Sequence, residues 1–130
     1  MLRMAVAAAA ICGPALAQGS DPNAAFPPTG GEGIYRGVCQ GCHMPDGQGA
    51  EGAGAYPALT GKRLQSAAYP AEVVIRGRKA MPPFGPYLSD QQIADVVNYV
   101  RTHFGNAYAD KATPELVRSL RPPATAGGGE

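Results

Sequence analysis

The sequence is short of net charge, of cysteine and of long apolar runs. Its 11 Lys and Arg face 10 Asp and Glu, so the formal net charge at pH 7 is only +1. A nucleic-acid-binding domain would show a strong basic excess, and the near-neutral balance therefore excludes that class. Three cysteines in 130 residues cannot supply the disulfide framework that holds many small secreted domains together.

The N-terminal stretch, residues 1–17, has the features of a secretory signal peptide. Arg3 gives it a charged start, an apolar run follows, and a small-residue cleavage site ends at Ala17. A membrane anchor needs about 20 apolar residues, whereas a Gly-Pro pair interrupts this run early. We therefore expect export to the periplasm and removal of residues 1–17, including Cys12. Residues 18–29 lack periodicity and are expected to form a flexible leader.

The two remaining cysteines lie in the pentapeptide Cys-Gln-Gly-Cys-His, as Cys39 and Cys42, with His43 directly after them. This spacing is the attachment signature of c-type haem. On one helical turn both sulfurs can reach the two vinyl groups along one porphyrin edge and form thioethers. The imidazole that follows can offer a neutral nitrogen to the iron. The motif predicts one haem c, covalently attached through Cys39 and Cys42 and ligated by His43.

Three other kinds of site use two cysteines. A structural zinc site needs four ligands, but the only other histidine, His103, lies far along the chain. A thioredoxin-like pair would follow a near-continuous Val/Ile strand, whereas Pro, Thr and Gly precede Cys39 here. A disulfide across two intervening residues of a helix is sterically poor and would leave His43 without a role. Haem attachment is favoured over all three.

Glycine and proline are both abundant, at 18 and 13 residues. This composition favours long ordered loops joined by a few helices. A chain of this length has a modest protein core once a signal peptide is removed. A buried macrocycle would supply the missing apolar mass, because loops can pack onto it.

Two capping boxes predict the first and the longest helix. Thr29 with Glu32, and Ser89 with Gln92, can each exchange hydrogen bonds between side chain and backbone N–H. The first helix would end before Pro45 and carry the two haem cysteines on its last turn. The second would carry one apolar stripe, made of Ile93, Val96, Val97, Val100 and Phe104.

Proline and glycine mark the ends of the other predicted helices. Pro70 and Pro114 suit the first helical position, where a missing N–H costs little. Gly77 and Gly105 suit the position after a helix end. We therefore expect short helices over residues 62–68, 70–76 and 114–120, and the end of the longest helix at Gly105.

A proline-rich run, Ala-Met-Pro-Pro-Phe-Gly-Pro, occupies residues 80–86. Consecutive prolines cannot donate backbone hydrogen bonds and forbid a helix, so the run should be a fixed extended loop. Met81 is the methionine placed to be a second axial ligand, because the others lie in the signal peptide or beside His43. A thioether is a soft neutral donor that raises the reduction potential. With both axial positions filled, the iron has no place for substrate, which predicts an electron carrier and not an enzyme.

The Gly-rich stretch after the motif formally matches a dinucleotide-binding fingerprint at Gly47, Gly49 and Gly52. The preceding buried strand and following helix of that fold are missing, so we reject the match. A loop whose backbone wraps closely around a flat ligand is the better interpretation.

Three cationic residues, Arg76, Arg78 and Lys79, cluster between a predicted helix and the proline-rich loop. An ordinary solvated face, a rim that docks redox partners and a contact for haem propionates all fit this pattern. We expect the cluster to belong to a docking rim.

Together these motifs resemble a class I cytochrome c over about residues 30–121. That family has a Gly-x-x-x-aromatic helix before the haem motif, a Pro-x-Leu after the haem loop and a distal Met-Pro. It also has an aromatic in the last helix that packs across the first helix near the glycine. The matching residues here are Gly31, Tyr35, Pro57, Leu59, Met81 with Pro82, and Tyr99.

The resemblance implies an all-α fold, with a few helices and Gly/Pro-rich loops wrapped around one covalently bound haem. It also implies that the Pro57 carbonyl accepts the ring N–H of His43 and orients it. The domain would span residues 30–121, and residues 122–130 would form a disordered tail. The region from Met81 onward is also similar to haem domains that serve bacterial membrane-bound alcohol dehydrogenases and related periplasmic dehydrogenases.

The function implied is that of a periplasmic single-electron carrier between redox proteins. A dehydrogenase would be the donor, and an oxidase or another cytochrome of the respiratory chain the acceptor. The dehydrogenase subunits that it resembles carry several haem domains, and this chain has one, which leaves the partner open. One alternative is a fixed electron-transfer subunit of a membrane-associated dehydrogenase complex. A less favoured one is a haem enzyme or sensor in which Met81 is displaceable.

Overall fold

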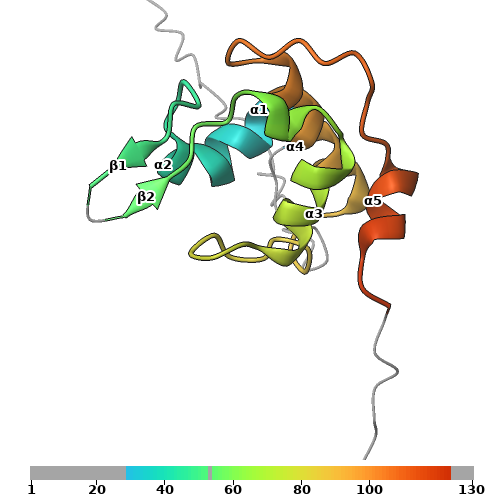
Figure 1. The fold of residues 1–130 in the computed structure, drawn as a ribbon. Coiled ribbons are helices and arrows are strands. Elements are labelled where there is room, and N and C mark those ends of the chain that lie inside the picture. Colours follow the sequence, from blue (N-terminus) through green and yellow to red (C-terminus); the bar gives the residue numbers. More distant parts are fainter. Residues whose placement is uncertain (1–28, 53, 124–130) are drawn as a thin grey trace, which may run out of the picture.

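The computed structural model describes residues 29–52 and 54–123. The predicted signal peptide, nearly all of the leader and most of the tail lie outside these residues. Figure 1 shows small helices around α4, with a short hairpin projecting to one side. The helices are α1 (Gly30–Ile34), η1 (Tyr35–Cys39), α2 (Gln40–His43), η2 (Lys62–Leu64), α3 (Ala68–Arg76), α4 (Asp90–Thr102) and α5 (Pro114–Leu120). The strands are β1 (Ala50–Glu51) and β2 (Ala55–Tyr56).

The elements α1, η1 and α2 follow one another without a break and form the predicted first helix, with a π-helical turn in its middle. The predicted capping box at its start is wrong. Thr29 has the extended backbone of an N-cap, but its side chain makes no capping hydrogen bond. The Glu32 carboxylate instead pairs with Arg36 at 2.8 Å, one helical turn on.

Helix α4 begins as predicted. Ser89 accepts from the Gln92 N–H, and the Gln92 side chain accepts from the Ser89 N–H, which completes the capping box. The helix ends at Thr102, three residues before the predicted stop. Phe104 has a left-handed φ of 58° and lies outside the helix. Its ring packs 4.9 Å from the Tyr35 ring, so Phe104 joins the core from a turn rather than from the helical stripe.

The crossing of α1 and α4 depends on Gly31. A Cβ on this residue would lie 2.5 Å from the Tyr99 Cβ and would also meet the Asp95 carbonyl. Helices cannot approach this closely with a larger side chain between them. Tyr99 therefore lies against the first helix at the glycine, as the resemblance implies.

Two of the three shorter helices differ from prediction, one in its length and one in its start. Only a 3₁₀ turn forms over the first part of residues 62–68. Helix α3 begins at Ala68, so Pro70 is its third residue. The first four N–H groups of a helix have no partner within it, so the missing N–H of proline costs little there. Gly77, with φ of 71°, ends α3 as predicted, and Pro114 is the first residue of α5 as predicted.

The Gly-rich stretch contains a two-stranded antiparallel hairpin, β1 with β2, that was not predicted. Gly49 has φ of 68°, and a Cβ there would lie 2.8 Å from the Pro57 carbonyl carbon. A Cβ on Gly47 would lie 2.6 Å from the Phe104 ring. These glycines are therefore needed because the chain approaches itself closely at these points.

The buried core lies where α1, α3 and α5 pack on α4. Helix α4 contributes the apolar side chains of Ile93, Ala94, Val96, Val97 and Val100 to it. The predicted arrangement of a few helices joined by Gly/Pro-rich loops is observed, with the small hairpin as an addition. Within the described residues, none of the helices has the length and apolar character to cross a membrane.

Candidate functional site

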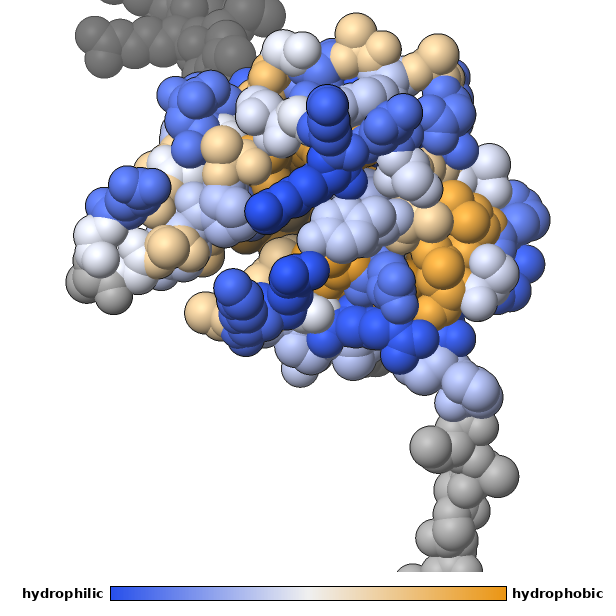
Figure 2. Space-filling view, in the orientation of Figure 1, coloured by the Kyte–Doolittle hydropathy of each residue, from blue (hydrophilic) through white to orange (hydrophobic). Residues whose placement is uncertain are grey.

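A cavity of about 940 Å³ opens between the end of α2, the hairpin, α3 and the loop after α3. The buried face of α4, with Val96, Val97 and Val100, closes it at the back. Its volume lies within the roughly 300–1,000 Å³ of cofactor and small-molecule sites. Figure 2 shows hydrophilic side chains reaching over a recess that is apolar in its depth. Such a site suits a large, flat, mainly apolar ligand with a polar edge.

His43 is the last residue of α2 and lines this cavity. Its Nδ1 lies 2.9 Å from the Pro57 carbonyl oxygen, the contact that the resemblance implies. A carbonyl can only accept, so Nδ1 carries the proton in this hydrogen bond. The lone pair of the imidazole is then on Nε2, which fixes the tautomer a metal ligand needs.

The turn after His43 is held by Tyr35. Its hydroxyl donates to the Met44 carbonyl at 2.7 Å, and Met44 leaves the helix with φ of 66°. Burial, together with the nearby Cys39, Tyr99 and Asp46, raises the pKa of Tyr35 to about 12. The phenol therefore stays protonated and remains a donor at physiological pH.

Cys39 and Cys42 both line the cavity, and no disulfide joins them. Burial, and to a lesser degree Cys42, raises the pKa of the Cys39 thiol to about 12. Among residues 29–52 and 54–123, no three His, Cys, Asp or Glu side chains gather to hold a metal ion. The zinc alternative therefore lacks a ligand set in this part of the chain.

Met81 lines the same cavity from the loop after α3. The backbones of Arg78 and Met81 exchange two hydrogen bonds of 3.0 Å each, which close a tight turn before the prolines. A Cβ on Gly77 would lie 2.6 Å from the Met81 carbonyl, so glycine is required beside this turn. The other candidate ligands, Met44 and His103, are not among the described residues that line the cavity.

The predicted cationic cluster divides into two parts. Arg78 and Lys79 line the cavity, and Arg78 donates to the Tyr69 hydroxyl at 3.0 Å. Arg76 is directed elsewhere, since it pairs with Glu72 at 3.2 Å and donates to the Leu120 carbonyl at 3.3 Å. Arg63 also lines the cavity and was not predicted. Only its place shortly after the Pro-x-Leu segment could have indicated it.

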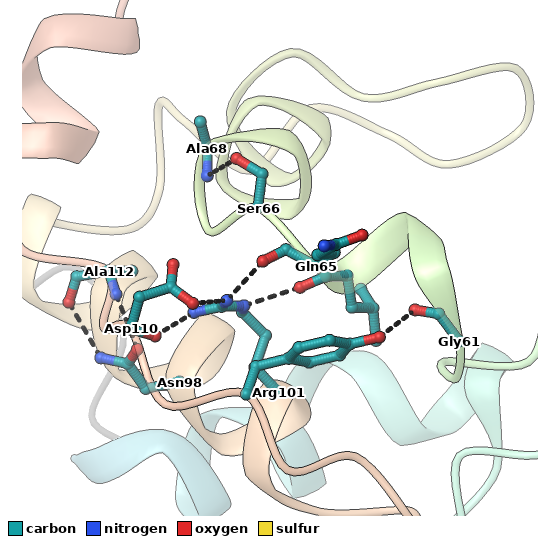
Figure 3. Close-up of polar contacts among 10 residues, drawn as sticks. Gly61, Gln65, Ser66, Ala68, Asn98, Arg101, Asp110 and Ala112 are labelled. Atoms are coloured by element: carbon teal, nitrogen blue, oxygen red, sulfur yellow. Dashed lines mark hydrogen bonds and ion pairs between the residues drawn. The ribbon is translucent and has the colours of Figure 1, made fainter.

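Arg101 was also missed, and it ties one wall of the cavity in place. The side chain is fully buried and donates to the carbonyls of Leu64 and Gln65 at 2.8 and 2.9 Å. It also bonds the backbone carbonyl and the carboxylate of Asp110, the latter at 2.6 Å (Figure 3). The Tyr108 ring lies 5.3 Å below its guanidinium. The signal in the sequence was its position four residues after Val97 on the buried stripe.

Asn106 holds the segment that follows Pro57. Its side-chain amide donates to the carbonyls of Leu59 and Val100, both at 2.8 Å, and accepts from the Gly61 N–H at 3.3 Å. The carbonyl that orients His43 thus belongs to a segment tied directly to the end of α4.

This combination of a helical fold, a Cys-x-x-Cys-His motif at a helix end and a methionine on the same cavity defines a c-type cytochrome. The family model described as cytochrome c oxidase, cbb3-type, subunit III matches residues 27–100, more than half of the sequence. The chain therefore belongs to this cytochrome c family. Membership indicates a covalently bound haem c and a role in electron transfer rather than in catalysis.

Curated relatives include the fructose dehydrogenase cytochrome subunit of Gluconobacter japonicus, which is 34% identical over 109 residues. The cytochrome c subunit of the alcohol dehydrogenase (quinone) of Gluconobacter oxydans is 34% identical over 112 residues. These alignments each cover 72% of this chain, and 22% and 23% of the relatives. The chain thus spans less than a quarter of the length of either relative. Their names confirm the predicted resemblance to dehydrogenase cytochrome subunits.

Among solved structures, the KustC0563 c-type cytochrome has 26% sequence identity and a TM-score of 0.51. The superposition covers 58% of this chain and 98% of that cytochrome. A whole small c-type cytochrome therefore corresponds to part of this chain, in agreement with the predicted fold class.

The residues of the cavity fit a haem. Two thiols, one imidazole with a fixed tautomer and one thioether reach it from two separate segments. Its walls are largely apolar, and cationic side chains that could pair with the carboxylates of a macrocycle are among its lining residues. None of the described residues that line the cavity conflicts with the shape or the polarity of a haem.

Proposed function

We propose that the chain is a periplasmic single-electron carrier whose haem is attached through Cys39 and Cys42 and ligated by His43 and Met81. The observation that carries the proposal is that these four side chains line one apolar cavity, although Met81 comes from a distant segment. Bound there, the haem would supply a one-electron iron couple in a site of low dielectric. The donor would be a dehydrogenase and the acceptor an oxidase or another cytochrome.

The protein's own residues would set the reduction potential of that iron couple. His43 offers Nε2 because Nδ1 is engaged by Pro57, and this hydrogen bond also fixes the plane of the ring. Met81 offers a neutral sulfur from a rigid turn, which favours the reduced state. With both ligands in place no coordination position is open to substrate, so the haem enzyme or sensor reading ranks last.

Optical spectra and a denaturing gel stained for covalent haem test the ligand set. The periplasmically expressed protein should give a sharp low-spin reduced spectrum and a weak sulfur-to-iron band in the near infrared. Met81→Ala should keep the haem on the gel but lose that band, whereas Cys39→Ala or Cys42→Ala should weaken covalent attachment. A high-spin wild-type spectrum that shifts with carbon monoxide would favour the enzyme or sensor instead.

Partner docking would use the cationic side chains at the cavity, which we define as the rim: Arg63, Arg78 and Lys79. Positive charge around an exposed haem edge speeds encounter with anionic partners and makes the rate depend on salt. Ferricyanide, an anionic oxidant, is a suitable probe. Replacing all three rim residues by Gln should remove most of the salt dependence of its reaction rate. Arg76→Gln is the matched control, because Arg76 pairs with Glu72 and does not line the cavity.

A fixed subunit of a membrane-associated dehydrogenase complex is the second candidate. The curated relatives favour it, since they are named as cytochrome subunits of fructose, alcohol and gluconate dehydrogenases. It predicts that the chain co-purifies with a large dehydrogenase subunit from membranes at moderate salt. A free carrier would instead be released with the periplasmic fraction.

A further inference from the structure

A single arginine at the end of α5 holds the segment that follows Met81. The Arg121 guanidinium donates to the carbonyls of Gly85 and Leu88, at 2.6 and 2.7 Å. It also donates to the Asp90 carboxylate at 2.6 Å. The side chain is only 28% exposed. One planar guanidinium thus joins the end of α5 to both ends of residues 85–88, the segment that leads from the proline-rich loop at Met81 (the Met81 loop) to α4.

The chain between Met81 and this anchor is stiff. It reads Met-Pro-Pro-Phe-Gly, and the prolines fix two backbone torsions. Phe84 donates its N–H to the Val74 carbonyl at 2.9 Å, and Gly85 donates to the Ile75 carbonyl at 3.2 Å. The segment is therefore held by α3 on one side and by Arg121 on the other. Because this stretch is stiff, a movement of the Gly85 backbone would also move Met81.

We propose that Arg121 is a positioning residue that keeps Met81 at the cavity wall. Without it, three acceptors lose a charged donor, and the loop spends more time in conformations that withdraw the sulfur. The inference rests on the proposed ligation by Met81. It gives the end of α5 a role in electron transfer that the haem motif does not reveal.

Arg118 offers a matched control. It pairs with the same carboxylate, through Asp90 Oδ2 at 3.3 Å, and its side chain is 66% exposed. Among the described contacts it donates to no carbonyl of the Met81 loop. Arg118→Gln therefore removes a charge from the same helix end and leaves the loop anchored.

Imidazole binding to the oxidised holoprotein measures how often Met81 leaves the iron. The apparent affinity of an added ligand scales with the fraction of molecules whose site is open. We expect Arg121→Gln to tighten imidazole binding about tenfold, and Arg118→Gln to change it less than twofold. Amide hydrogen exchange gives a readout independent of the iron. Phe84 and Gly85 should exchange faster in R121Q and unchanged in R118Q.

A double-mutant cycle separates this inference from the proposed function. In an M81A background the site is already open, so adding R121Q should change imidazole affinity less than twofold. An equal effect of R121Q with and without Met81, or no effect in either, would overturn the positioning role. If M81A alone leaves the spectrum and the imidazole affinity unchanged, the proposed ligation fails, and the inference fails with it. Should R121Q not retain haem, Arg121→Lys carries the same test, because an ammonium keeps the charge but lacks the planar fork that arginine presents to the two carbonyls and the carboxylate.

Discussion

At the scale of single residues, Arg101 shows how a charge can be kept inside a small core. The bare cost of burying a guanidinium is several kcal/mol. Here it is offset by the carbonyls of Leu64 and Gln65 and by the carboxylate of Asp110. Because these acceptors come from the end of η2 and from the loop after α4, the arginine also fixes the wall that carries Leu64 to the cavity. A buried charge thus joins a short 3₁₀ turn and a loop that lie far apart in the sequence.

This ion pair predicts acid-sensitive stability. The hydrogen bond from Arg101 lowers the pKa of Asp110 below its ordinary value, against a smaller opposing effect of desolvation. A depressed pKa in the folded state means that the contribution is complete above the unfolded pKa of about 3.9 and is lost as pH falls through the folded value. Asp110→Asn should lower the urea midpoint at neutral pH and flatten its decline in acid. If the urea midpoint of the variant falls in acid as steeply as that of the wild type, the ionisation of Asp110 does not contribute to stability.

The same residues show what the sequence can predict at this scale. The motif cysteines, His43 and Met81 are recognisable from spacing, and the structure places all of them on one cavity. Their role as haem residues remains a prediction. Arg101, Asn106 and Arg121 were not predicted, because their partners are backbone carbonyls of distant loops. Backbone acceptors carry no residue signature, so such contacts are visible only once the chain is folded.

At the scale of elements, the two helix starts provide a paired test of capping. Ser89 accepts from the Gln92 N–H at 3.2 Å, whereas the Thr29 side chain caps nothing. Loss of an N-cap hydrogen bond costs about 1 kcal/mol. Ser89→Ala should therefore lower the free energy of unfolding by that amount, measured by urea denaturation of the holoprotein. Thr29→Ala should change it by a few tenths at most, and an equal loss in both variants would contradict the assignment of the caps.

The crossing of α1 and α4 provides a second paired test. A Cβ at Gly31 would meet the backbone of Asp95 and the Tyr99 side chain, and neither can move without shifting α4. Overpacking of this kind costs about 1–3 kcal/mol. Gly41 is also helical, but nothing lies within 4 Å of a Cβ there. Gly31→Ala should lower the thermal midpoint, whereas Gly41→Ala should keep or raise it, since alanine favours a helix by about 0.5–1 kcal/mol. A drop in both would mean that the motif helix tolerates no substitution.

Elements with a strong local signal could be predicted, and those decided by tertiary contacts could not. Helix α4 has a capping box and an apolar stripe, α5 has an N-cap residue and a proline at its first position, and both start where predicted. The hairpin escaped notice because its strands have two residues each, too few for an alternating pattern. The end of α4 was misjudged because Phe104 continues the apolar spacing although its backbone turns to a positive φ.

At the scale of the whole molecule, the fold is built around α4. Helices α1, α3 and α5 all pack on it (Figure 1). Its buried apolar face also closes the back of the cavity. The same side chains, Val96, Val97 and Val100, thus belong both to the core and to the cavity wall. The class of fold was predictable because composition, motif and spacing all agree. The path of the loops could not be predicted from the sequence, since it depends on the group that the loops enclose.

The loops around the cavity should therefore depend on the haem for their order. A ligand that binds only the folded state stabilises it, and here the ligand would also cover apolar surface that is otherwise open to water. A variant with both Cys39→Ala and Cys42→Ala, purified without haem, should unfold at a lower urea concentration than the holoprotein. Its m-value should also be smaller, because less surface is buried in its folded state. Circular dichroism at rising urea measures both quantities. Adding haem back without covalent attachment should restore part of the lost urea midpoint. If the apoprotein is instead as stable and as cooperative as the holoprotein, the helices alone define this fold.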